Sequence, residues 1–244
     1  MIVVTSWDDG HPADLKIASL LNQYGLAGTF FVPIRNIEGQ PVMCGQDLRA
    51  IDKHHEIGSH TYSHRRLDSV NHKVAREEIV SGKSALEDIL GHEVTGFCYP
   101  GGRITRDAID CLQQANFSYA RSIENFRLDV GNDVYRMPTT MHVSPHMKNV
   151  YVRNFIKRGN FIRRAYCFSR AMASDSVWTT LERIASERAA EPIVLHFWGH
   201  SWEIERLDLW GPLERFLEFV NSLNPVSLTA AQCIETLRNR TVVH

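Results

Sequence analysis

Two short blocks of the chain hold residue types that could carry out metal-assisted hydrolysis. Ser6-Trp7-Asp8-Asp9-Gly10 supplies two adjacent carboxylates, and His60-Thr61-Tyr62-Ser63-His64 supplies two imidazoles. Such chemistry needs nitrogen and oxygen ligands for a divalent ion and a further base that takes a proton from water. Each block follows an apolar segment typical of a β-strand, and α/β enzymes gather their chemistry at strand ends.

The spacing within each block favours a shared site. His60 and His64 are four residues apart, which places both imidazoles on one face of a helical turn or tight loop. In a regular strand Asp8 and Asp9 would face opposite ways, but Gly10 allows the backbone to turn so that both carboxylates can reach the site. One carboxylate could then complete a facial two-histidine, one-aspartate ligand set while the other acts as a base.

The rest of the chain alternates segments typical of strands with segments typical of helices. We expect strands at residues 2–7, 27–33, 56–59, 95–98, 118–120 and 193–198. We expect helices at residues 14–24, 47–54, 73–90, 104–115, 177–188, 213–223 and 229–238. This alternation predicts an α/β fold, a distorted (β/α)7-type barrel that forms a single domain over residues 1–244. The alternation breaks at about residues 122–175, which we interpret as an irregular basic insertion.

Composition narrows the functional classes. The 244 residues are 43% apolar and 23% charged, as in ordinary globular domains, and the formal net charge of -1 gives no sign of nucleic-acid binding. No apolar run reaches the roughly 18 residues of a transmembrane segment. The five cysteines are scattered and odd in number, and no signal peptide precedes the first block, so we expect reduced thiols and a cytoplasmic location.

The motifs resemble those of the polysaccharide deacetylase family, the NodB-homology domain of carbohydrate esterase family four. Ser6-Trp7-Asp8-Asp9-Gly10 is similar to the family's Thr-Phe-Asp-Asp-Gly, and His60-Thr61-Tyr62-Ser63-His64 matches His-(Ser/Thr)-x-x-His. Between them, Ala27-Gly28-Thr29-Phe30-Phe31-Val32 looks like the family's Ala-Thr-Phe-Phe-Val strand. The similarity is specific to about residue 120, loose afterwards, and recovers near the last strand.

The resemblance implies a barrel that binds one divalent ion, usually zinc, with cobalt, nickel or manganese as alternatives, and that hydrolyses acyl groups on sugars. It also implies that Asp8 is the general base and that Asp9, His60 and His64 are the metal ligands. Phe97-Cys98-Tyr99-Pro100-Gly101-Gly102 falls where the family's Arg-x-Pro-(Tyr/Phe)-Gly motif should be. There the N–H of Gly101 would stabilise the oxyanion of the tetrahedral intermediate.

The chain departs from the family pattern at two motifs. Cys98 stands where the family has an arginine, and we find no counterpart of the fourth motif's aspartate and tryptophan. In the family that arginine tunes the base, so Arg103 and Arg136 are candidates to replace it.

The family also places a histidine after the last strand to protonate the leaving group. The chain offers both His196 and His200 there. We favour His200 because it lies past Gly199, at the carboxyl end of the strand, whereas His196 could simply pack within the barrel.

Aromatic and basic residues suggest what the site would bind. Sugar rings stack on aromatic side chains, and five aromatics lie in or near the motifs, although each could equally belong to the core: Trp7, Tyr62, Tyr99, Trp198 and Trp202. Residues 148–170 contain seven basic residues and no acidic ones. Arg163 and Arg164 could therefore clamp a phosphate, the alternative being a solvated helix face.

The sequence thus predicts a metal-dependent deacetylase of N-acetylated sugars. Cytoplasmic nucleotide-linked or lipid-linked precursors of a surface polysaccharide are the candidate substrates. Two alternatives stay open: a related-fold amide hydrolase on a non-sugar substrate, resembling allantoinases, and a non-catalytic glycan-binding domain. The paired carboxylates favour an enzyme, because a binding module has no need for a spare base.

Overall fold

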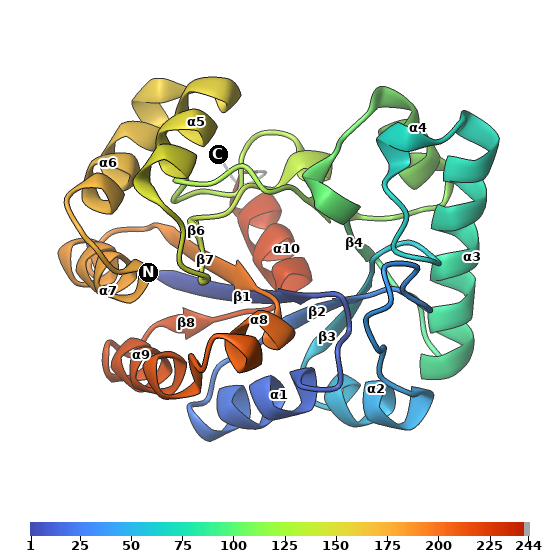
Figure 1. Ribbon diagram of the computed structural model, residues 1–244, viewed down its shortest axis with the longest axis horizontal. Coiled ribbons are helices and arrows are strands. Elements are labelled where there is room, and N and C mark those ends of the chain that lie inside the picture. Colours follow the sequence, from blue (N-terminus) through green and yellow to red (C-terminus); the bar gives the residue numbers. More distant parts are fainter. Residues whose placement is uncertain (242–244) are drawn as a thin grey trace.

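A curled sheet of parallel strands forms the centre of the computed structural model, which describes residues 1–241 (Figure 1). The strands follow the spatial order β5-β4-β3-β2-β1-β7-β6, and β8 pairs with the start of β1. Their bounds are β1 Ile2–Asp8, β2 Thr29–Val32, β3 Glu56–Ser59, β4 Gly96–Cys98, β5 Tyr119–Arg121, β6 Met141–His142, β7 Val194–Gly199 and β8 Val226–Ser227. This arrangement confirms the predicted α/β class and the distorted (β/α)7-type barrel.

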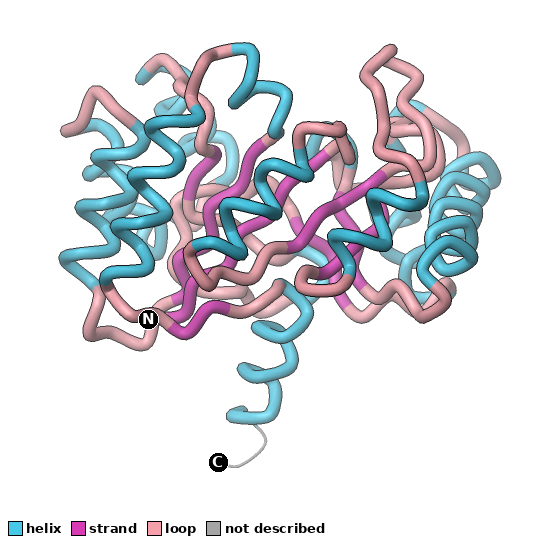
Figure 2. The backbone as a smooth tube through the Cα atoms, turned by 90° about the horizontal axis from the view of Figure 1, so that it is seen from below, coloured by secondary structure: helices cyan, strands magenta, loops and turns pink. Residues whose placement is uncertain are grey.

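Helices cover the sheet, most of them on its outer side, while the last one packs against its inner face (Figure 1). They are α1 Asp14–Gln23, α2 Gly45–Asp52, α3 His72–Leu90, α4 Arg106–Gln114, α5 Lys148–Arg158, α6 Phe161–Met172, α7 Val177–Arg188, α8 Ser201–Arg206, α9 Trp210–Ser222 and α10 Ala230–Thr241. The end of α10 projects away from the other elements (Figure 2). Among the described residues, no helix combines the length and apolar character needed to cross a membrane.

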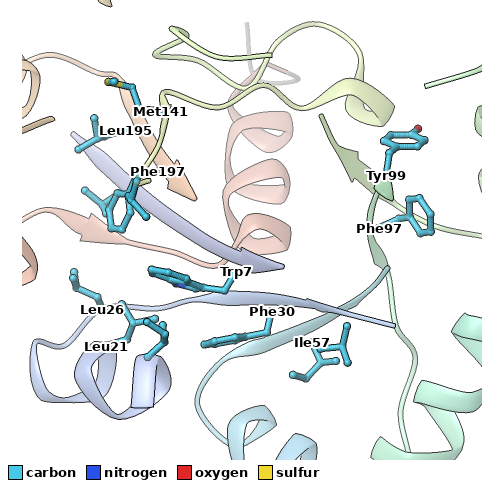
Figure 3. Packing of buried hydrophobic residues seen from close by; sticks show 14 of the residues in the cluster. Trp7, Leu21, Leu26, Phe30, Ile57, Phe97, Tyr99, Met141, Leu195 and Phe197 are labelled. Atoms are coloured by element: carbon cyan, nitrogen blue, oxygen red, sulfur yellow. The ribbon is translucent and has the colours of Figure 1, made fainter. Parts of the chain in front are cut away.

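Alternation along β1 sends successive side chains to the two faces of the sheet. Trp7 packs in the outer core with Leu21 of α1 (Figure 3), whereas Val4 belongs to an inner cluster that includes Cys233 of α10. Asp8 has the parity of Val4 and therefore points into the barrel. The strand thus directs a carboxylate to the interior while its tryptophan anchors the helix layer.

The predicted irregular insertion at residues 122–175 is irregular only in its first half. Residues 148–158 and 161–172 form the helices α5 and α6, which pack against each other. The prediction missed α6 because a buried arginine, Arg164, stands on its apolar face and hides its periodicity. It missed α5 because that helix buries only Tyr151 and so has no apolar stripe. The first half is a connection in which Thr140 N–H donates to His196 O, so that it lies against β7.

The Arg164 side chain joins α5 to α6. Its Nε donates to Asn125 O, Nη1 donates to Phe155 O and Gly159 O, and Nη2 donates to Asn154 O and to the Asn125 side chain. The five N–H donors of a guanidinium are therefore all used inside the fold. Two of the acceptors, Phe155 O in the last turn of α5 and Gly159 O directly after it, are carbonyls that a helix end leaves without a partner in the helix.

Replacing Arg164 should destabilise the fold. Arg164→Met leaves these buried acceptors without donors, so we expect the free energy of unfolding in urea to fall by about 3 kcal/mol. Arg163→Met is the matched control. The Arg163 side chain, adjacent in sequence to Arg164, is exposed, so its replacement should change the free energy of unfolding by less than about 0.5 kcal/mol. Equal losses in the two variants would contradict the structural role given to Arg164.

Candidate active site

A sharp turn at the end of β1 brings both carboxylates into one cavity. Asp8 is the last residue of β1, and Asp9 and Gly10 follow with φ of 78° and 63°. This left-handed backbone is unusual for aspartate and natural for glycine. A Cβ on Gly10 would lie 2.6 Å from Val32 Cγ1, so this position has no room for a side chain. The turn cancels the alternation that would otherwise separate the two aspartates.

His60 and His64 lie in a tight loop after β3. Thr61 and His64 both have positive φ, 67° and 59°, and the two imidazole ring centres lie 5.0 Å apart. The spacing of four residues therefore brings the rings together through a loop, one of the two geometries that the sequence allowed.

Helix α3 supports this loop. The Glu78 carboxylate accepts hydrogen bonds from Ser63 N–H at 2.8 Å and from Ser63 Oγ at 2.6 Å. A Cβ on Gly82 would lie 2.8 Å from the carbonyl carbon of Thr61, so glycine lets the helix approach the loop backbone closely. The positions of the two imidazoles thus depend on α3 as well as on β3.

Asp9 Oδ1 faces both imidazoles, 3.1 Å from His64 Nε2 and 3.6 Å from His60 Nε2. His60 Nδ1 lies 2.8 Å from Cys98 O, so that ring atom donates and Nε2 carries the lone pair toward Asp9. Burial lowers the pKa of His60 to about 4, which keeps the ring neutral. One carboxylate oxygen and two imidazole nitrogens, all within 4.8 Å of one another, form a donor set that fits a divalent ion such as zinc.

Asp8 has a different partner. Arg121, at the end of β5, is fully buried and donates from Nη2 to Asp8 Oδ1. Burial by itself would raise the pKa of Asp8, but the Arg121 charge and the nearby imidazoles hold that pKa below its ordinary value. The Arg121 guanidinium also lies 4.5 Å from the ring centre of Trp198. Asp8 is therefore an ionised carboxylate that an arginine holds beside the donor set.

Arg121 was not among the residues that the sequence analysis selected. Arg103 contacts Asp68 and Arg136 contacts Asp133, both at the surface, so neither of the two candidates reaches Asp8. The available signal was position: Arg121 directly follows the predicted strand at 118–120, at the same edge of the sheet as the two motifs.

The two histidines of the last strand have different environments. His196 is 1% exposed within β7, its Nε2 lies 2.9 Å from Ser6 Oγ, and burial lowers its pKa to about 3. His200 lines the cavity, with Nε2 3.9 Å from Asp9 Oδ2 and Nδ1 2.9 Å from Glu203 Oε2. The geometry favours His200 as the group that could reach a substrate.

Glu203 is a second residue that the sequence analysis missed. The same oxygen that contacts His200 lies 3.1 Å from His142 Nε2, and the His142 ring lies 4.2 Å from that of Trp198. Helix α8 begins at Ser201, directly after His200, and Glu203 lies in its first turn. Residues three positions apart lie on the same face of a helix, so the Glu203 side chain can reach His200. The carboxylate fixes the orientation of the His200 ring.

One cavity of about 250 Å³ joins most of these groups. It is lined by Asp8, Asp9, Glu38, His60, His64, Arg66, Tyr99, Gly101, Gly102, Ile123, Trp198, His200 and Trp202. Two of the predicted aromatic contacts are wrong. Trp7 is fully buried in the outer core, on the opposite face of β1 from Asp8, and Tyr62 lies outside the lining, with its ring 5.5 Å from the Arg35 guanidinium.

The predicted phosphate clamp of Arg163 and Arg164 is also wrong. All donors of Arg164 are bound within the fold, as described above. Arg163 lines a separate cavity with Met1 and Val194, at the opposite end of β1 and β7 from the aspartates. The two neighbours on α6 therefore face different surroundings.

Comparison with known proteins places the motifs in a family. Residues 1–120 match the family model described as polysaccharide deacetylase. The peptidoglycan-N-acetylglucosamine deacetylase of Bacillus cereus is 30% identical over 117 residues, 47% of this chain and 42% of that protein. A Wigglesworthia glossinidia brevipalpis protein named as a probable 4-deoxy-4-formamido-L-arabinose-phosphoundecaprenol deformylase is 30% identical over 82 residues, 32% of this chain and 29% of that protein. The matches thus span less than half of the length of these relatives.

The similarity of fold extends over almost the whole chain. The structure of a chitin deacetylase from Colletotrichum lindemuthianum superposes with a TM-score of 0.61 at 14% identity, covering 95% of this chain and 86% of that one. At this identity the comparison supports the fold and says nothing about activity.

The buried pair of Arg121 and Asp8 yields a stability prediction. Arg121→Met leaves Asp8 buried without its cation, so we expect the free energy of unfolding to fall by about 3–5 kcal/mol near neutral pH. Arg103→Met is the matched control, because Arg103 is exposed and its distant contact with Asp68 should contribute less than about 1 kcal/mol. A stability unchanged by Arg121→Met would show that Asp8 does not depend on this arginine.

Proposed function

Because this chain belongs to the polysaccharide deacetylase family, we propose that it is a metal-dependent hydrolase that removes acetyl or related acyl groups from N-acetylated sugars. One observation carries the proposal. The two adjacent aspartates have separate environments: Asp9 faces His60 and His64, while Asp8 pairs with Arg121 beside them. A hydrolase needs this separation between ligand and base.

Asp9, His60 and His64 would hold the metal ion. Two imidazole nitrogens and one carboxylate oxygen suit zinc, and this facial set leaves coordination positions open. Cys98 O and the Glu38 carboxylate, 3.7 Å from His64 Nδ1, would orient the two imidazoles from behind. The bound ion would supply Lewis-acid chemistry at the acyl carbonyl and make water more acidic.

The other side chains would move protons and orient the substrate. Asp8, kept ionised by Arg121, would take a proton from the attacking water. The N–H of Gly101 would stabilise the negative charge that develops on the acyl oxygen. His200, oriented by Glu203, would give a proton to the leaving nitrogen, and acetate and the free amine would result.

The cavity walls support a sugar as the substrate. Trp198 and Trp202 line the cavity and offer ring surfaces to the C–H faces of a sugar, whereas the Tyr99 side chain is 1% exposed and belongs to the core. Of the two candidate precursors of a surface polysaccharide, nucleotide-linked and lipid-linked, similarity to a protein named as a deformylase of a lipid-phosphate-linked sugar supports the lipid-linked one. The five cysteines are free, which supports a reducing compartment such as the cytoplasm.

Metal content tests the ligand set. We expect the purified protein to bind about one zinc or similar divalent ion per chain, and His60→Ala/His64→Ala to lose it, because two of three protein ligands are removed. His54→Ala/His72→Ala is the matched control, since both histidines lie outside the cavity. Metal analysis that finds no ion in the unmodified protein, even after reconstitution, would favour a non-catalytic glycan-binding domain.

Replacement of the base separates catalysis from metal binding. Asp8→Asn keeps the shape of the side chain but removes the proton acceptor, so we expect at least a roughly 100-fold loss of kcat with metal content retained. The measurement is acetate release from a panel of N-acetylated sugars, nucleotide-linked sugars included. Substantial residual turnover in Asp8→Asn would reject Asp8 as the base, and release from a urea-type substrate alone would favour the non-sugar amide hydrolase.

A further inference from the structure

The turn between α5 and α6 exposes three large apolar side chains. The exposed fractions are 65% for Ile156, 51% for Phe161 and 94% for Ile162. These residues lie within seven positions of one another in the chain, although exposed large apolar residues elsewhere are scattered. Clustered apolar exposure of this kind marks a surface that contacts something other than water.

Basic residues surround this apolar cluster. Residues 148–170 hold seven of the chain's 27 basic residues and none of its 28 acidic ones, so the remainder of the chain has a formal net charge of -8. Three of the seven are engaged: Lys148 with Asp175, Arg170 with Glu187, and Arg164 with backbone carbonyls. No ion pair involves the other four within residues 1–241, and these are Arg153, Lys157, Arg158 and Arg163.

The turn is held in a defined shape. Gly159 has φ of 62° and ψ of -149°, a region reserved for glycine, and Asn160 has the left-handed φ of 54°. Arg164 donates to the carbonyls of Asn154, Phe155 and Gly159, which lie directly before the turn. The apolar side chains are therefore presented outward by a fixed backbone and do not belong to a loop that could fold back onto the protein.

A second group of charged residues lies at the rim of the catalytic cavity. Arg103 contacts Asp68, which also pairs with Arg66, and Arg66 lines the cavity. This group is separate from Arg163, which lines a cavity at the opposite end of β1 and β7.

We propose that the α5–α6 turn, formed by Ile156, Phe161 and Ile162 with the cations around them, docks onto the surface of an anionic lipid bilayer. A few exposed apolar side chains flanked by Lys and Arg suit the boundary between headgroups and acyl chains. A stable protein interface buries about 800 Å² on each partner, which is more than three side chains at a turn provide. The docking does not depend on the proposed deacetylase activity.

Vesicle flotation tests the proposal with the full chain. We expect it to float with vesicles of phosphatidylcholine containing about one third phosphatidylglycerol, more weakly with pure phosphatidylcholine, and less as salt increases. Phe161→Ser/Ile162→Ser and Lys157→Glu/Arg163→Glu should each weaken binding at least about tenfold, because they remove the inserted side chains or reverse the attracting charges.

Matched controls keep the experiment decisive. Val80→Ser removes an apolar side chain that is 38% exposed on α3, across the molecule from α5 and α6 (Figure 1). Lys53→Glu/Arg106→Glu makes the same change in net charge at two exposed residues outside α5 and α6. Both controls should bind as the unmodified protein does, and thermal unfolding should show that every variant is folded. Equal binding by turn and control variants would overturn the proposal. The proposal would also fail if the unmodified protein did not bind anionic vesicles. If the turn variants then changed its self-association in sedimentation, the surface would instead contact a second copy of the chain.

Discussion

The left-handed backbone at Asp9 and Gly10 is the constraint on which the site depends. In a regular strand, Asp8 and Asp9 would lie on opposite faces of the sheet, one in the barrel and the other under the helices. A non-glycine residue in this conformation costs about 1–3 kcal/mol unless its surroundings hold it there. Two contacts do so: Gly10 lies against Val32, and the Trp202 indole N–H donates to Asp9 Oδ2 at 2.9 Å.

The partners of the two carboxylates then separate their chemistry. Asp9 faces the imidazoles of His60 and His64, side chains of a type that binds metals, whereas Asp8 faces a permanent cation that keeps it ionised at a buried position. The cation comes from β5, while the neighbouring strand β4 contributes Cys98, whose Sγ lies 3.7 Å from Asp8 Oδ2. Because the carboxyl ends of the strands converge in a barrel, Arg121 of β5 can place its cation beside Asp8, where the family resemblance led us to expect an arginine at the position of Cys98 in β4.

Neighbouring basic residues of α6 also have different uses. Arg164 lies inside the protein and donates hydrogen bonds to the C-terminal end of α5, while Arg163, one position away, is exposed. Helical geometry turns successive side chains by about 100°, so adjacent residues face different surroundings. A count of charges in residues 148–170 cannot distinguish an arginine that closes a helix end from one that is available to a ligand, and this is why the predicted clamp failed.

The sequence by itself determined the fold class and the two motifs that supply the candidate metal ligands, because strand and helix periodicity and the strand-end motifs are local properties of the chain. It also contained enough information to suspect Arg121, a charge at the end of a predicted strand. Only the tertiary structure decided that Arg121, and neither Arg103 nor Arg136, meets Asp8, and that Glu203 orients His200. It also decided that Trp7 is core while Trp198 and Trp202 line the cavity. Those outcomes depend on how strands converge and which face each helix covers, and such distances are set by packing across the barrel rather than by neighbours in the sequence.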